Sequence, residues 1–134
     1  MLVTKEIDYA VRIVRDLSRG GRKTIDEICL NELIPRQFSY KILKKLEKAG
    51  MVQIFRGAGG GYKMAMDASS ITLFDVISSI NSEPLLSECL RQGYNCPLDG
   101  KDGKPCGIHN ELSRIQDLVF AHLREKSMAD IFNS

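Results

Sequence analysis

Residues 36–62 read RQFSYKILKKLEKAGMVQIFRGAGGGY, and this stretch decides the fold. Apolar residues recur in its first half at helical spacing, with lysines off that stripe, which predicts an amphipathic helix ended by Gly50. The stripe expected to face the core comprises Phe38, Ile42, Leu43, Leu46 and Ala49. The second half alternates as two half-buried strands, 51–55 and 62–66, joined by a glycine-rich turn. The stretch therefore predicts a basic helix followed by a β-hairpin.

Two further helices are expected before this stretch. Thr4 is a candidate N-cap for an amphipathic helix that ends at Gly20. Thr24 and Glu27 have capping-box spacing at the start of a short helix, whose buried side includes Cys29 as a core thiol. A short helix, a tight turn and a basic helix form a helix-turn-helix pattern, and the hairpin adds a wing. We therefore expect a mainly α fold with a small β-hairpin, the winged helix-turn-helix domain occupying residues 1–66.

Length and composition restrict the class of protein. The 134 residues are 43% hydrophobic and 27% charged, which excludes global disorder and favours a single domain. No run approaches the roughly 18 apolar residues of a membrane span, and residues 1–6 lack the features of a signal peptide. We expect a cytoplasmic protein with no membrane partner.

Charge is distributed unevenly along the chain. Residues 1–66 hold 13 Lys and Arg against 7 Asp and Glu, whereas residues 67–134 hold 6 against 10. A basic first half favours a polyanion as partner, although such charges also serve solubility alone. Because the lysines follow a predicted helix-turn-helix, we expect the partner to be double-stranded DNA.

The basic helix and the hairpin supply the candidate DNA contacts. Base edges in the major groove are expected to meet Gln37, Tyr40 and Lys41. Phosphates are expected to meet Arg36, Lys44, Lys45 and Lys63. The wing places Arg56 beside Gly57, Gly59 and Gly60, which suits insertion into the minor groove. A plain flexible turn remains the alternative for the glycines, and nucleotide binding is excluded because phosphate-cradling loops run from a strand into a helix.

The second half predicts two helices separated by a long irregular segment. Thr72 caps a short helix, and residues 81–107 then lack periodicity. A long helix begins near Ile108, and its apolar seam comprises Leu112, Ile115, Val119 and Leu123. We expect residues 67–107 to form a linking helix and cysteine-bearing loop. Residues 108–134 are expected to form a dimerisation helix and a tail, with packing within the chain as the alternative.

The irregular segment holds three of the four cysteines. Cys89, Cys96 and Cys106 are followed closely by His109, and thiolates with an imidazole suit an iron-sulfur cluster or zinc. The spacing matches neither zinc ribbons nor ferredoxins, so a thiol switch stays open. An enzyme is not expected, nor a small-molecule substrate, because the sequence has no nucleophile-base pair or cofactor fingerprint.

Several of these residues together resemble a known family. They are Tyr9-Ala10, Ile28, Ile34-Pro35, residues 46–50, residues 56–62, Ile71-Thr72, Val76-Ile77 and the three loop cysteines. In this pattern the chain resembles the IscR/NsrR family of bacterial winged-helix regulators over nearly its whole length. The resemblance implies a homodimer that binds DNA through the helix-turn-helix and wing and holds an iron-sulfur cluster on Cys89, Cys96 and Cys106. The function it implies is a regulator, expected to be a repressor, of iron-sulfur, iron or redox and nitric-oxide stress genes.

Two residues compete as the fourth cluster ligand. His109 follows Cys106 as in IscR-like members, which implies a two-iron two-sulfur cluster. Asp8 stands where NsrR-like members place a carboxylate, which suits a four-iron four-sulfur cluster. We favour His109 because its spacing places it on the first helical turn beside Cys106. The alternative for His109 is a role in capping that helix, and the alternative for Asp8 is a solvent-exposed acid in the first turn of its helix. The wider gap before Cys106 and Ala58 in place of a wing proline depart from the family pattern.

Overall fold

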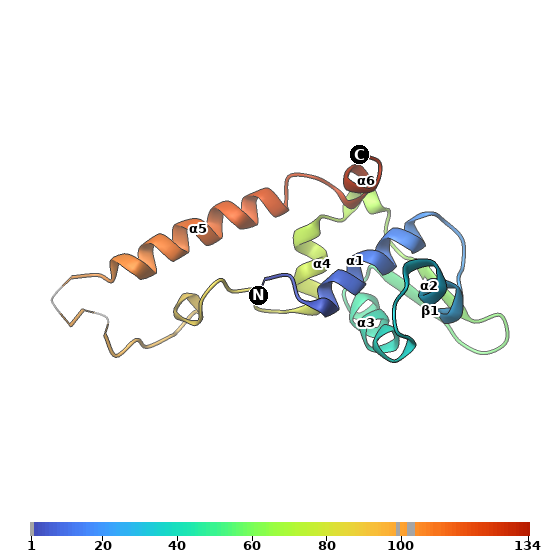
Figure 1. Ribbon diagram of the computed structural model, residues 1–134, viewed down its shortest axis with the longest axis horizontal. Coiled ribbons are helices and arrows are strands. Elements are labelled where there is room, and N and C mark those ends of the chain that lie inside the picture. Colours follow the sequence, from blue (N-terminus) through green and yellow to red (C-terminus); the bar gives the residue numbers. More distant parts are fainter. Residues whose placement is uncertain (1, 99, 102–103) are drawn as a thin grey trace.

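The computed structural model describes residues 2–98, 100–101 and 104–134. The chain is mostly helical, with a two-stranded antiparallel hairpin as its sheet (Figure 1). The elements in order are α1 (Lys5–Ser18), α2 (Ile25–Glu32), α3 (Arg36–Lys48), β1 (Val52–Phe55), β2 (Gly61–Met64), η1 (Ala68–Ser70), α4 (Leu73–Ile80), η2 (Glu88–Leu90), α5 (Gly107–Leu123) and α6 (Met128–Phe132). The expected fold class, a mainly helical winged helix-turn-helix, is confirmed.

Local capping explains where several helices begin. The Thr4 hydroxyl accepts a hydrogen bond from the Ile7 amide at the start of α1. Thr24 opens α2 with a complete capping box, and Thr72 opens α4 in the same way. A third capping box, begun by Ser127, opens α6. The first three starts follow the sequence expectation.

The core is built around α1, which packs against α2, α3 and α4. Ile7, Ile13 and Val14 of α1 have no exposed surface. The same core receives Ile71 and Met128, both fully buried, from the second half of the chain. The Met128 amide also donates a hydrogen bond to the Ile71 carbonyl at 2.6 Å. The C-terminal tail is therefore part of the same hydrophobic body as the first 66 residues.

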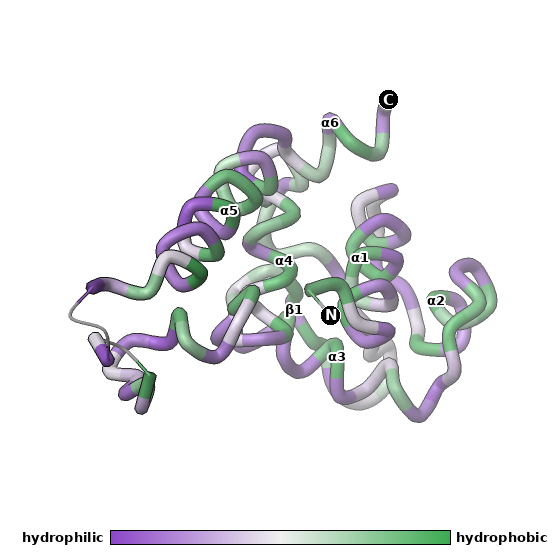
Figure 2. The backbone as a smooth tube through the Cα atoms, turned by 60° about the vertical axis from the view of Figure 1, so that its left-hand side comes forward, coloured by the Kyte–Doolittle hydropathy of each residue, from purple (hydrophilic) through white to green (hydrophobic). Residues whose placement is uncertain are grey.

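Helix α5 projects away from this body (Figures 1 and 2). None of its residues is buried within the chain. Its C-terminal end is held by an edge-to-face contact between Phe120 and Phe74, whose ring centroids are 5.0 Å apart. Arg124 lies over the Phe74 ring at 3.8 Å. Along its length the helix also contacts η2, and the Leu86 amide donates to Gln116 Oε1 at 2.7 Å, so α5 is only partly covered by the rest of the chain.

Two residues of the predicted apolar stripe are exposed instead. Phe38 keeps 49% of its surface accessible, and Ala49 is also exposed. Ser39 takes the buried place in the first turn of α3, and its hydroxyl donates to the Pro35 carbonyl at 3.2 Å. Phe38 lies at the edge of the contact with α1, with its ring centroid 6.1 Å from that of Tyr9. The core expectation for Phe38 and Ala49 is therefore wrong, because α3 reaches the body only from Ser39 to Leu46.

Candidate nucleic-acid interface and cysteine loop

Helix α3 presents a basic face to solvent. Its buried side comprises Ser39, Ile42, Leu43 and Leu46. The opposite side is exposed and comprises Arg36, Gln37, Tyr40, Lys41 and Lys44. Figure 1 shows α3 and the hairpin loop along one edge of the body, away from the C-terminus. Most of the predicted contacts on this helix are thus accessible to a large ligand.

Arg36 and Tyr40 form a hydrogen-bonded pair on this face. Arg36 Nε and Nη2 both donate to the Tyr40 hydroxyl, at 3.1 and 3.0 Å, and Nη1 donates to Asp26 at 2.8 Å. The hydrogen bond to Tyr40, followed by the charge of Asp26, raises the pKa of Arg36 above its ordinary value. Arg36 remains a cation, and these contacts fix its position at the N-terminal end of α3.

Lys45 does not lie on the exposed face with the other lysines. Its ammonium nitrogen is 2.7 Å from Glu6 Oε1 and 3.4 Å from the Ile80 carbonyl oxygen. The side chains of Lys45 and Glu6 are each 32% exposed. This lysine connects α3 to α1 and α4 and does not belong to the exposed basic face of α3. Its position therefore conflicts with the phosphate contact expected from the sequence.

The hairpin forms a wing whose tip is exposed. Strands β1 and β2 pair from Val52 with Met64 to Phe55 with Gly61. Arg56, Gly57 and Gly59 are exposed at the tip, and Lys63 is exposed on β2.

The turn at this tip is tightly closed. The Gly60 amide donates to the Gly57 carbonyl at 2.9 Å. A Cβ at Gly60 would lie 2.8 Å from the carbonyl oxygens of Gly57 and Phe55. The tight turn therefore requires a residue without a side chain at position 60, independently of any close approach to DNA.

A contact that sequence reasoning missed joins the wing to the loop between α1 and α2. The Arg22 guanidinium lies 3.6 Å over the Phe55 ring and donates to the Gly59 carbonyl at 2.5 Å. Lys23 forms an isolated antiparallel bridge with Tyr62. The one available signal was a pair of basic residues directly after Gly20-Gly21. That signal did not show which segment the pair would meet.

Two buried carboxylates hold α1, α2 and this loop together. Asp16 is fully buried and accepts from Lys23 Nζ at 2.7 Å and from Asn31 Nδ2 at 3.2 Å. Glu32 is 4% exposed, and both of its carboxylate oxygens accept from Arg15. Buried charges need such partners to offset desolvation. The network fixes α1 and α2, the two helices on which the N-terminal part of α3 packs.

The three loop cysteines are free and half-buried. Cys89 lies in η2, which packs against α5, and its sulfur is 3.4 Å from the Ser87 hydroxyl. Cys106 is the N-cap of α5, and its sulfur accepts a hydrogen bond from the His109 amide at 3.5 Å. Within residues 2–98, 100–101 and 104–134, no three His, Cys, Asp or Glu side chains are grouped closely enough to hold a metal ion.

The competing fourth ligands occupy different elements. His109 is half-buried in the first turn of α5, three residues after Cys106. Asp8 lies on α1 and forms an ion pair with Arg12 at 2.9 Å. His122 lies near the other end of α5, exposed, with Nδ1 3.2 Å from Glu125. Of the two, His109 shares the junction between the loop and α5 with Cys106, whereas Asp8 lies on α1.

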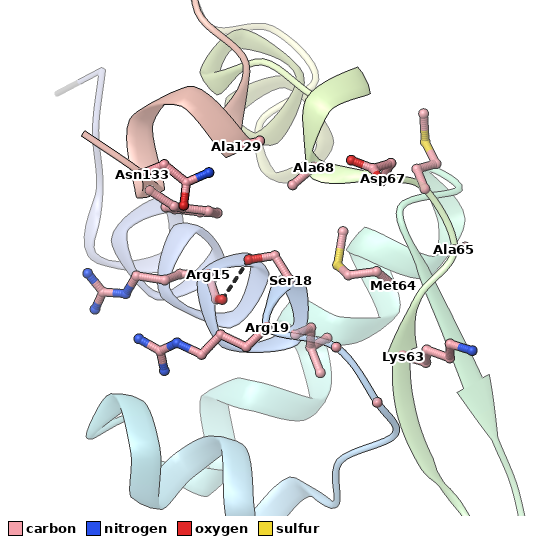
Figure 3. A pocket seen from close by; sticks show the side chains of 15 residues that line it. Arg15, Ser18, Arg19, Lys63, Met64, Ala65, Asp67, Ala68, Ala129 and Asn133 are labelled. Atoms are coloured by element: carbon pink, nitrogen blue, oxygen red, sulfur yellow. Dashed lines mark hydrogen bonds between the residues drawn. The ribbon is translucent and has the colours of Figure 1, made fainter.

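A cavity of about 580 Å³ lies between the end of α1, the segment after β2 and α6 (Figure 3). Figure 3 shows Ser18, Met64 and Asn133 around it, whereas the charged ends of Arg15 and Arg19 point away. Both arginines are engaged with the buried carboxylates. Lys63 and Asp67 also line the cavity, and its described lining residues include no nucleophile-base pair.

Residues 3–134 match the Rrf2 family, which is described as an iron-dependent transcriptional regulator. The chain belongs to the Rrf2 family. Protein aau3 of Rhizobium meliloti is 33% identical to this Rrf2 chain over 134 residues, covering 98% of the chain and 84% of the relative. The HTH-type transcriptional regulator IscR of Escherichia coli is 27% identical over 137 residues, covering 100% of the chain and 82% of that protein. The Rrf2 chain is thus a transcriptional regulator, and its family is not one of enzymes.

Solved structures share the same Rrf2 fold. The oxidized form of Staphylococcus aureus CymR has a TM-score of 0.73 at 18% identity, with 100% of this chain and 98% of that chain covered. The T. potens IscR structure has a TM-score of 0.71 at 20% identity, with 98% and 85% covered. In the part of the chain that the structure describes, no helix is long and apolar enough to cross a membrane.

Proposed function

We propose that this Rrf2 chain is a homodimeric DNA-binding repressor of the cytoplasm whose operator affinity is set by an iron-sulfur cluster. The genes proposed as its targets serve iron-sulfur, iron or redox and nitric-oxide stress functions. The observation that carries DNA binding is the basic face of α3 beside an exposed wing on a rigid body. Tyr40, Gln37 and Lys41 are proposed to meet base edges, while Arg36 and Lys44 meet phosphates.

The wing completes this interface. Arg56 stands at a tip flanked by exposed Gly57 and Gly59, so a minor groove can receive its guanidinium without obstruction from neighbouring side chains. Lys63 is exposed on β2 and supplies a further phosphate contact. This arrangement divides the work between a helix that reads sequence and a hairpin that reads groove shape.

Dimerisation through α5 follows from its exposed apolar side. Ile108 keeps 73% of its surface accessible and Leu118 keeps 52%, while Ile115 and Val119 lie on the same long helix. A second copy related by a two-fold axis would bury these residues and place two recognition helices on one duplex. Half-sites then lie roughly 34 Å apart.

The chemistry of the donor set fits an iron-sulfur cluster. Three thiols and one imidazole are soft ligands, and Cys106 stands at the N-terminus of the 17-residue helix α5. We propose Cys89, Cys96, Cys106 and His109 as the ligands, with a two-iron two-sulfur cluster favoured over a four-iron four-sulfur cluster. Asp8 is the alternative fourth ligand, and it would have to leave its ion pair with Arg12. When bound, the cluster supplies a redox-sensitive and iron-dependent group.

The loop connects this group to DNA binding. It lies between α4, which packs on α1 and α3, and α5, which we propose as the dimer helix. If the loop cysteines held a cluster, the loop would be constrained, and one arrangement of α5 relative to the body would be favoured. Such a preference shifts DNA affinity by the difference in binding to the two arrangements.

A zinc site or a thiol switch is the second candidate for the same cysteines. The free, half-buried state of the three thiols favours a thiol switch among these alternatives. The fold is also that of CymR, a protein solved in an oxidized form. A zinc or thiol-switch regulator binds DNA equally well but is colourless, so visible absorbance separates it from the cluster.

The experiment that tests DNA binding is fluorescence anisotropy with DNA from upstream of the protein's own gene. The wild-type chain is expected to bind, and Arg56→Ala is expected to weaken that binding, because it removes the cation proposed for the minor groove. Lys126→Ala is the matched control, because Lys126 is an exposed cation outside α3, the wing and α5. If the Arg56→Ala chain binds this DNA as tightly as the wild type does, and binds a randomised library as tightly too, the assigned interface is refuted.

A further inference from the structure

We infer that Arg22 is a positioning residue of the wing, and that it holds the hairpin tip in the orientation that delivers Arg56 to DNA. This inference rests on the proposed DNA-binding function. Arg22 is exposed and lies outside the helix-turn-helix and outside the hairpin. Its role is therefore to connect the tip to the body.

The contacts of Arg22 bracket the tip. The guanidinium carbon lies 3.6 Å from the centroid of the Phe55 ring, the last residue of β1. Nη1 donates to the Gly59 carbonyl at 2.5 Å, on the far side of Arg56. A cation over an aromatic face and a charge-assisted hydrogen bond both favour one orientation. Arg22 thus spans the segment that carries Arg56 and ties both of its ends.

The backbone beside Arg22 fixes the base of the wing. The Lys23 amide donates to the Tyr62 carbonyl at 2.9 Å, and the Tyr62 amide donates to the Lys23 carbonyl at 2.8 Å. Gly61 is buried against this segment, where a Cβ would lie 2.7 Å from the Lys23 carbonyl oxygen and 3.1 Å from Arg22 Cγ. The loop and the hairpin are therefore in direct backbone contact.

Lys23 continues this connection into the core. Its ammonium nitrogen donates to the Asp16 carboxylate at 2.7 Å and to the Asp16 carbonyl at 2.8 Å. Asp16 is fully buried on α1. A continuous set of contacts therefore runs from the rigid core through Lys23 and Arg22 to the wing tip. The tip is held from outside the hairpin as well as by strand pairing.

A direct phosphate contact by Arg22 is the competing role, and the two roles differ in what they predict. A phosphate contact depends on charge, so Arg22→Lys would retain it and Arg22→Gln would lower the salt slope by about 0.9. Positioning depends on a flat guanidinium over Phe55, which lysine does not provide. Arg22→Lys should then fail to rescue affinity.

The test uses the full-length chain and a duplex that the wild-type protein selects from a randomised library. Arg22→Gln and Phe55→Leu should each weaken binding on the order of tenfold, because each removes the stacked contact. The matched control is Lys126→Gln, an exposed cation outside α3, the wing and α5, which should bind as the wild type does. Thermal unfolding followed by circular dichroism should show the Arg22 variants folded, since the side chain is exposed.

A double-variant cycle separates positioning from a merely structural effect. If Arg22 acts through Arg56, the double variant Arg22→Gln/Arg56→Ala should bind within about threefold of Arg56→Ala alone. Arg22→Gln combined with Lys44→Ala should instead show additive effects, because Lys44 lies on α3. Additive effects with Arg56→Ala, or rescue by Arg22→Lys, would overturn the inference. Failure of the wild type to select any duplex would overturn the proposed function itself, and the two failures are thus distinct.

Discussion

Lys45 and Glu6 form an ion pair of 2.7 Å that joins the recognition helix to α1. The neighbouring Lys44 is exposed on the other side of the same helix. Two adjacent lysines of one basic run therefore have different roles. One stabilises the position of α3, and the other is available to DNA.

The first prediction separates these two lysines. Lys44→Ala should lower the slope of log affinity against log salt by about 0.9, because it removes one cation from the phosphate backbone. Lys45→Ala should leave this slope unchanged and reduce the free energy of unfolding by roughly 0.5–1 kcal/mol, as expected for a partly exposed pair. Anisotropy titrations over a range of salt and urea denaturation measure the two quantities. An unchanged slope in Lys44→Ala would remove this residue from the DNA face.

The second prediction concerns the cysteine loop. Cys106→Ala should leave the fold intact, abolish visible absorbance and remove the dependence of operator affinity on iron. Cys29→Ser is the matched control, because Cys29 lies on α2 with its sulfur 3.3 Å from the Ser39 hydroxyl. Absorption spectra and operator titrations of anaerobically purified protein measure both effects. Iron-dependent regulation that survives in Cys106→Ala would contradict the assigned ligand set.

A third prediction tests the role of α5. Ile115→Asp should convert the dimer to monomer, because it places a charge in the proposed apolar interface. Asp117→Asn removes a charge two positions further along the helix, on a different side, and should leave the dimer intact. Sedimentation velocity measures the oligomeric state. A dimer that persists unchanged in Ile115→Asp would place the interface elsewhere.

The fourth prediction concerns pH and the base of the wing. Burial raises the pKa of Tyr62 above its ordinary value of 10.0, with a smaller effect from Tyr40. The folded state therefore holds the phenol proton more tightly than the unfolded state does. Its stabilising contribution is complete below pH 10 and is lost as pH rises through the higher folded pKa. Denaturation of wild type and Tyr62→Phe across this range should show a steeper decline in the wild type. Parallel curves would contradict a raised pKa of Tyr62 in the folded state.

Much of the fold could be predicted because its signals are local. Thr24 and Thr72 open helices through hydrogen bonds with residues three positions away, and the wing glycines interrupt two alternating strands. The exposure of Phe38 could not be predicted, because spacing alone does not show where α3 leaves the body, and there Ser39 is buried instead. Periodicity describes one helix, whereas burial depends on its neighbours.

The candidate site was less predictable where contacts join distant segments. Arg22 and Gly59 are 37 positions apart, and Lys45 and Glu6 are 39 apart, so no spacing rule connects them. The cysteine loop gives residue types suited to a cluster, but its spacing matches no short motif. The sequence therefore indicates the donor chemistry of this loop, and the roles of Cys89, Cys96 and Cys106 stay predictions.

The most direct test of a cluster-controlled regulator is a paired measurement on anaerobically purified protein. Iron and acid-labile sulfide are quantified per chain, and operator affinity is measured on the same sample before and after the metal is removed. The expected result is bound iron and sulfide together with an affinity that changes on their removal. Protein that contains neither iron nor sulfide, even after reconstitution, and binds its operator unchanged would contradict the proposal.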